Sequence, residues 1–119
     1  MNKNDIDMCV ADTLRDDEIE KLDSILHALN HEESSSWRVA RGTWFSVEEV
    51  RAALSRLIDA GLVTPCAEQP PTNEVISLPR EKMGSLPWSD LWFHLEGTGR
   101  DAVDRWWEAE GRINYPLTR

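Results

Sequence analysis

The most regular hydrophobic pattern in the chain runs from Ser46 to Val63. Apolar residues recur there at helical spacing, and polar residues occupy the opposite side. Ser46 and Glu49 have the spacing of a capping box, in which each side chain accepts a hydrogen bond from the other residue's backbone amide. Gly61 suits the left-handed conformation that ends many helices. The pattern predicts an amphipathic helix over residues 46–60 that buries Val47, Val50, Ala53, Leu54, Leu57 and Ile58.

A second helical stripe precedes this helix. It predicts a helix that Asp16 or Asp17 caps and that runs to about Asn30, with Ile19, Leu22, Leu26 and Leu29 on its apolar stripe and Ile25 at the margin. Residues 37–41 can form a single turn that Gly42 ends. The order of long helix, short helix, tight turn and long helix is that of a helix-turn-helix. We expect Trp37 or Trp44 to fill the angle between the helices.

The remaining apolar segments predict a small sheet. Residues 62–63 and 91–95 suit two strands that pair with each other. Residues 64–90 between them contain five prolines, and only residues 75–78 suit a strand, so we expect a long hairpin loop. The fold class predicted is mainly α with a small β-hairpin.

A last helix is predicted over residues 98–110, ended by Gly111. It carries Ala102, Val103, Trp106 and Ala109 on one side. Because neighbouring residues point about 100 degrees apart on a helix, Trp106 and Trp107 cannot both face the core. We therefore expect one of them at the surface, and a homodimer contact through Trp106 and Trp107.

Length and charge change this picture at the N-terminus. A chain of 119 residues suits one domain. We predict a flexible acidic arm over residues 1–14, the domain over residues 15–111 and a tail over residues 112–119. The net charge of -9 is concentrated in residues 1–33, which contain ten acidic and three basic residues. Such a charge argues against non-specific binding to nucleic acid or anionic lipid.

The chemistry of the chain favours a non-catalytic, cytoplasmic protein without a cofactor. It contains no glycine-rich phosphate loop and no nucleophile motif. Cys9 and Cys66 lack the spacing of a zinc site, and no secretory signal or membrane-length apolar segment is present. His27 and His31 could share a metal ion on one helix face, but no spacing supplies a third ligand, so a solvated polar face fits better.

Two short stretches of the chain resemble phrases of a known family. They consist of Ala52, Ala53, Leu54, Leu57, Gly61, Leu62 and Val63, followed after a loop by Trp92, Phe93, His94, Leu95, Gly99 and Arg100. In this respect the chain resembles winged-helix regulators of the MarR-like and PadR-like types, over about residues 15–110 as architecture. The resemblance implies a winged helix-turn-helix, with residues 46–60 as the recognition helix and residues 64–90 as an enlarged wing. Glu96 and Gly97 replace the family's helix cap, which leaves Thr98 for that position.

Function remains open between two classes. If the resemblance implies DNA binding, the contacts would come from Arg38, Arg41, Arg51, Ser55, Arg56, Arg80 and Lys82. The arginines and the lysine of this set could equally be surface charges that pair with acidic residues of the chain. Glu48 and Glu49 in the first turn would face the phosphates. We therefore favour an acidic protein-protein interaction module over a DNA-binding transcriptional regulator that uses residues 46–60 and 64–90.

Overall fold

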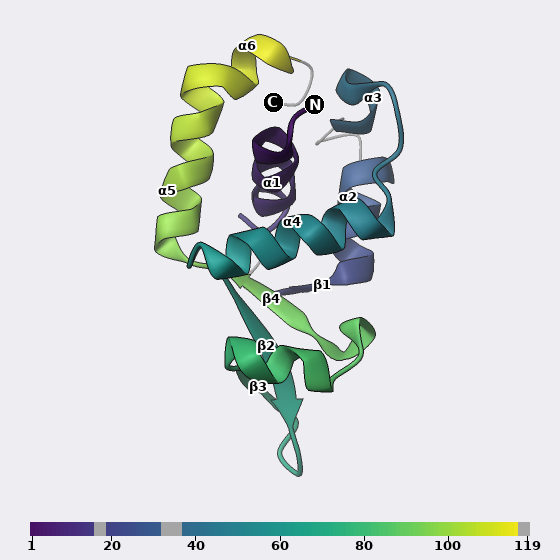
Figure 1. Cartoon of the computed structure of the whole chain (residues 1–119), viewed down its shortest axis with the longest axis vertical. Coiled ribbons are helices and arrows are strands. Elements are labelled where there is room, and N and C mark those ends of the chain that lie inside the picture. Colours follow the sequence, from purple (N-terminus) through teal and green to yellow (C-terminus); the bar gives the residue numbers. More distant parts are fainter. Residues whose placement is uncertain (16–18, 32–36, 117–119) are drawn as a thin grey trace.

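The computed structural model describes residues 1–15, 19–31 and 37–116 (Figure 1). Its helical elements are α1 (Lys3–Asp12), α2 (Leu22–His31), α3 (Trp37–Arg41), α4 (Val47–Asp59), the 3-10 turns η1 (Arg80–Ser85) and η2 (Trp88–Asp90), α5 (Gly97–Trp106), the π turn η3 (Trp107–Gly111) and α6 (Arg112–Asn114). Its strands are β1 (Glu20–Lys21), β2 (Val63–Gln69), β3 (Glu74–Ser77) and β4 (Trp92–Leu95). Within these residues the strands form one antiparallel sheet in the order β1-β4-β2-β3. The prediction of a mainly helical chain with a small antiparallel sheet is therefore confirmed.

Helix α4 forms as the sequence predicts. Ser46 caps it, and the capping box with Glu49 is complete. Gly61 adopts a left-handed φ of 75° after the helix ends. The predicted apolar stripe is buried at Val50, Ala53, Leu54, Leu57 and Ile58. Val47, by contrast, is 42% exposed at the first position of the helix.

The N-terminal segment is a helix, and the flexible arm predicted for residues 1–14 is therefore wrong. The Asn2 side chain caps α1 by accepting a hydrogen bond from the Asp5 amide at 2.8 Å. Figure 1 shows α1 enclosed by α2, α4 and α5. Its buried apolar residues are Ile6, Met8, Cys9, Val10 and Ala11, followed by Leu14. A helix enclosed by other elements has no single apolar stripe, which is why helical periodicity did not indicate it.

Helix α2 begins at Leu22, several residues later than predicted. Glu20 and Lys21 instead extend the sheet, opposite Phe93 and Trp92 of β4. The helix buries Leu22, Ile25 and Leu29. The predicted start at positions 16 and 17 lies outside the described residues. The short helix α3 and its left-handed stop at Gly42 are confirmed.

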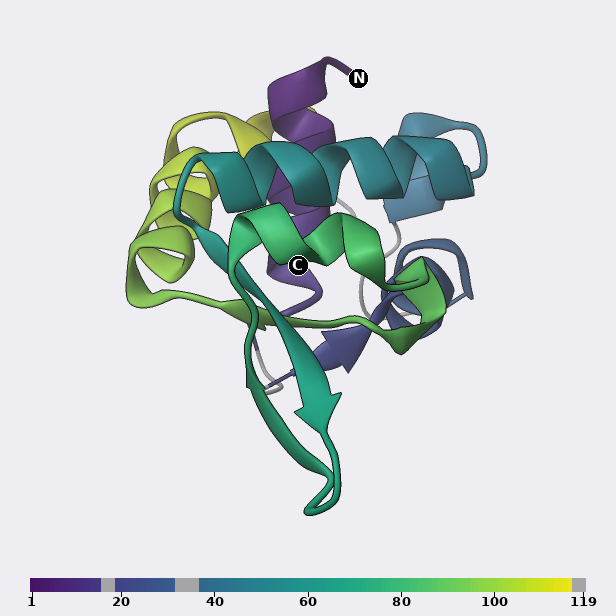
Figure 2. The ribbon, with the colours of Figure 1, turned by 60° about the horizontal axis from the view of Figure 1, so that its bottom comes forward.

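The segment 64–90 is not the long loop that the sequence predicts. Strand β2 pairs with β4 from Val63 opposite Leu95, as expected, but it continues to Gln69 and forms a second hairpin with β3 (Figure 2). Four of the five prolines that suggested a loop lie just outside the strands and 3-10 turns, where proline is tolerated. Pro70 and Pro71 follow β2 at the turn, and Pro79 and Pro87 directly precede η1 and η2.

The last helix begins earlier and ends later than predicted. Glu96, not Thr98, occupies the N-cap position of α5, while the Thr98 hydroxyl donates to the Gly61 carbonyl at 3.2 Å. Gly111 does not end the helix, because η3 leads directly into α6. A Cβ atom at Gly111 would lie 2.7 Å from Trp107 and 2.8 Å from Trp106. This glycine therefore allows the close packing of the two tryptophans.

Candidate interaction surface

The turn between α3 and α4 presents an exposed tryptophan. Trp44 keeps 53% of its surface exposed, so it does not fill the angle between the helices as Trp37 does. The Arg38 guanidinium lies 4.4 Å from the centre of the Trp44 ring, and the His31 ring centre lies 4.9 Å from it. Val39 and Val47 are 58% and 42% exposed in the adjoining helices. We call Arg38, Val39, Trp44 and Val47 the Trp44 surface.

The end of α2 supports the Trp44 surface. The Asn30 side chain donates to the Phe45 carbonyl at 3.0 Å and accepts from the Phe45 amide at 2.8 Å. The Arg38 Nε atom donates to the Asn30 carbonyl at 2.9 Å. These contacts join α2, α3 and the turn, so the surface is ordered before any partner binds. The role of Asn30 is not visible in the sequence, where it marks only the end of a helix.

The first turn of α4 is partly neutralised by the chain itself. Arg41 donates to the Glu49 carboxylate and lies over the Phe45 ring at 4.4 Å. Partial burial raises the pKa of Glu49, but hydrogen bonds from Arg41 and from the Ser46 amide outweigh it and leave the pKa below its usual value. Glu48, by contrast, is exposed.

We expect Glu49→Gln to destabilise the protein at neutral pH by about 0.5–1 kcal/mol, because glutamine keeps the capping geometry but loses the charge opposite Arg41. The pKa of Glu49 is lower in the folded than in the unfolded chain. Its stabilisation is therefore complete above the unfolded pKa and is lost as the pH falls through the folded one. Urea unfolding of both proteins at several pH values measures this. A difference that persists in acid would contradict it.

Three of the other predicted DNA contacts, Arg51, Arg56 and Arg80, are also engaged within the chain. Arg56 of α4 donates to the Asp7 carboxylate of α1 through Nε at 3.0 Å and Nη2 at 2.7 Å. The Arg80 Nε atom lies 2.9 Å from the Asp59 carboxylate. The Arg51 guanidinium lies 4.8 Å from the centre of the Trp88 ring. Ser55 is half-buried, and Lys82 is exposed without an ion pair among the described residues.

A homodimer contact through Trp106 and Trp107 stays a prediction, and the structure leaves little exposed surface on either ring for it. Trp106 is only 6% exposed, and its indole N–H donates to the buried Asp5 carboxylate at 2.9 Å. Trp107 is half-buried, with its ring centre 6.1 Å from that of Trp37. Helix α1 and the residues after α5 pack against Trp106 and Trp107, and these contacts could not be inferred from the sequence.

The residues that bear on metal and thiol chemistry are the two histidines considered as metal ligands, His27 and His31, and the two cysteines. The ring centres of His27 and His31 lie 5.1 Å apart, and the described residues gather no group of three or more His, Cys, Asp or Glu that could hold a metal ion. Burial raises the pKa of the Cys9 thiol, with Asp12 and Asp5 adding to the effect, and burial likewise raises the pKa of Cys66. Both residues therefore remain protonated thiols at neutral pH.

None of the helices in the described part of the chain combines the length and the apolar character that crossing a membrane requires. Comparisons of the chain with models of protein families, with curated proteins and with solved structures found no match. A functional proposal therefore depends on the contacts of this chain's own residues.

Proposed function

We propose that the protein is a non-catalytic protein-interaction module of the winged-helix type, which contacts its partner through the Trp44 surface. The observation that carries the proposal is the exposure of Trp44, at 53%, on a turn held by Asn30. Tryptophan and arginine are enriched among the residues that dominate binding energy at protein interfaces. An exposed tryptophan with an arginine over its ring suits such a contact, and the helices on either side of the turn each present an exposed valine.

The order of elements supports the winged-helix architecture. Helices α2, α3 and α4 follow one another with a tight turn before α4. Helix α4 is followed by β2, which forms a hairpin with β3 and also pairs with β4. In that architecture α4 has the position of the recognition helix, and the hairpin of β2 and β3 has that of the wing (Figures 1 and 2). The fold alone does not imply DNA binding.

The state of the basic residues favours protein over DNA as the partner. Arg41, Arg56 and Arg80 each form an ion pair with an acid of the chain. A phosphate contact by any of them would need that pair to break or to be shared, in a chain whose net charge of -9 already repels DNA. Arg38, Arg51 and Lys82 have no ion pair among the described residues. Arg38 instead contacts the Asn30 carbonyl and the Trp44 ring, and three bases provide only a weak attraction.

We expect no binding when the protein is titrated into a fluorescent random duplex at low ionic strength, followed by anisotropy. Low salt favours any electrostatic attraction to phosphates, so a negative result there is decisive. Binding that weakens steeply with salt, and that is lost in the Arg51→Ala, Lys82→Ala double variant, would instead establish the DNA-binding regulator. The Arg100→Ala, Arg105→Ala double variant removes two exposed bases from α5 and is the control for the same change of net charge.

A companion experiment tests the Trp44 surface directly. Ile113 is 65% exposed on α6 and gives a matched control for the loss of an exposed apolar side chain. From an extract of the source cells, we expect the same protein to be retained by the native chain and by Ile113→Ala, but not by Trp44→Ala. Equal retention by Trp44→Ala and the native chain would contradict the assignment of this surface.

A further inference from the structure

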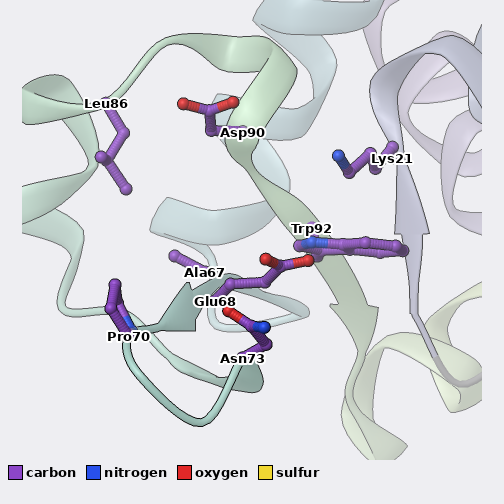
Figure 3. Close-up of a pocket in the computed structure, with 8 residues that line it drawn as sticks. All are labelled: Lys21, Ala67, Glu68, Pro70, Asn73, Leu86, Asp90 and Trp92. Carbon is purple, nitrogen blue, oxygen red and sulfur yellow. The ribbon is translucent and has the colours of Figure 1, made fainter.

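A hollow of about 300 Å³ lies beside the sheet, far in sequence from the Trp44 surface (Figure 3). It opens between the β2–β3 hairpin and the segment that leads from η1 into β4. Its charged and aromatic walls are Lys21, Glu68, Asp90 and Trp92, and Leu86 and Pro70 provide apolar surface. This volume is at the lower end of the range for small-ligand sites and suits a single side chain.

The register of the sheet brings these residues together. Trp92 of β4 lies opposite Lys21 of β1 and opposite Cys66 of β2. Glu68 is two residues beyond Cys66, so the alternation along a strand places it on the same face as Trp92. Asp90 comes from η2, directly before β4. Figure 3 shows Asp90 and Glu68 on different sides of the hollow, with the edge of Trp92 between them.

The carboxylates of the hollow are not paired within the chain as far as it is described. Glu68 and Asp90 are exposed, and within the described residues the side chain of neither forms a hydrogen bond or an ion pair. Asp7, Glu49 and Asp59, by contrast, each pair with an arginine. The hollow therefore offers two unused negative charges to a ligand.

The aromatic wall already attracts a cation. The Lys21 ammonium lies 4.8 Å from the centre of the Trp92 ring, a distance typical of a cation–π contact. One ammonium opposes two carboxylates, so the hollow keeps a net negative charge. A ligand with a positive charge and a flat or aliphatic body matches this combination of ring, acids and apolar wall.

We propose that the hollow binds an arginine side chain of the partner protein. The guanidinium is planar, stacks on indole rings and donates several hydrogen bonds to carboxylates. Its aliphatic stem suits the apolar surface of Leu86 and Pro70. A basic segment in the partner also complements the net charge of -9. This inference rests on the proposed function, because it takes the source of the cation to be a partner chain.

The test is an NMR titration of the whole protein with Nα-acetylarginine amide, followed at the indole N–H signal of Trp92. The control ligand is Nα-acetylcitrulline amide, which has the same shape without the charge. We expect a saturable shift with the arginine compound and a much weaker response with the citrulline compound. The absence of a saturable shift, or an equal response to both compounds, would overturn the proposal.

Three variants assign the site. Glu68→Gln and Asp90→Asn should each weaken binding about two- to fivefold, the range expected for exposed ion pairs. Lys21→Gln should tighten binding by a similar factor, because the lysine competes for the ring and adds positive charge. An anion-binding hollow would give the opposite result with Lys21→Gln. Such a result, or unchanged affinity in both acid variants, would contradict a cation site.

The source of the cation is tested with a capped Gly-Gly-Arg-Gly-Gly peptide. Tighter binding of the peptide than of the capped amino acid supports a partner chain, whereas equal binding would overturn that part of the proposal in favour of a free guanidinium compound. Duplex DNA binding by a protein that also binds capped arginine would overturn the proposed function alone. A protein that binds neither would overturn this inference alone.

Discussion

Asp5→Ala is expected to destabilise the protein by about 3 kcal/mol. The Asp5 side chain is buried and accepts hydrogen bonds from the Trp106 indole at 2.9 Å and from the Tyr115 hydroxyl at 2.8 Å. Alanine would leave the buried Trp106 indole N–H without its acceptor, and a buried donor left unpaired costs about 1–3 kcal/mol. It would also remove the hydrogen bond that Asp5 accepts from the half-buried Tyr115 hydroxyl. Burial and the hydrogen bond to Asp5 raise the pKa of Tyr115 to about 12, so the tyrosine stays a donor at neutral pH. Urea unfolding measures the loss.

The control for this prediction is Asp101→Ala, which removes an exposed acid from α5. It should change the free energy of unfolding by less than about 0.5 kcal/mol. Asp5→Asn keeps one oxygen as an acceptor, so its effect should lie between the two. If Asp5→Ala proved as stable as Asp101→Ala, the buried carboxylate would have no structural role.

Gly99→Ala is expected to cost about 3 kcal/mol or to prevent folding. A Cβ atom at this position would lie 2.3 Å from the Leu62 carbonyl oxygen and 2.6 Å from the Leu95 side chain. The Leu62 oxygen cannot easily move away, because it also accepts a hydrogen bond from the Glu96 amide at 2.9 Å. Overpacking of this kind typically costs about 1–3 kcal/mol, and a clash with backbone raises the cost. Thermal unfolding followed by circular dichroism provides the measurement.

Gly97→Ala is the matched control, two residues earlier in the same helix. A Cβ atom there meets nothing within 4 Å. Alanine favours helix over glycine, so this variant should be as stable as the native chain or slightly more stable. Similar unfolding temperatures for the two variants would mean that α5 can shift away from Leu62, against the packing described above.

Sequence patterns predicted α4 well because its determinants are local. The cap at Ser46, the apolar stripe and the stop at Gly61 all lie within 16 residues of one another. Helix α1 escaped prediction because its burial depends on α4 and α5, which lie far along the chain. The second hairpin escaped because prolines, which count against strands, stand at its boundaries and at Pro65 within β2.

The candidate site was less predictable than α4 because its contacts join residues that lie far apart in the chain. The sequence indicated which bases could reach a ligand, but their partners are distant: Arg56 pairs with Asp7, 49 residues away. Helical spacing within α4 cannot reveal such a pair. The sequence could not decide whether Trp37 or Trp44 fills the angle between the helices, because the position of Trp44 depends on a turn that the distant Asn30 side chain holds. The hollow at Trp92 requires the sheet register, which places Lys21 beside that ring.

The hydrogen bond between Asp5 and Tyr115 joins residues 110 positions apart. During synthesis, the first helix of this chain therefore leaves the ribosome long before the donors that satisfy its buried carboxylate exist. Until Trp106 and Tyr115 emerge, α1 has neither these donors nor the packing of α5. The packing of α1 against α5 can therefore be completed only after the C-terminal helices have been translated.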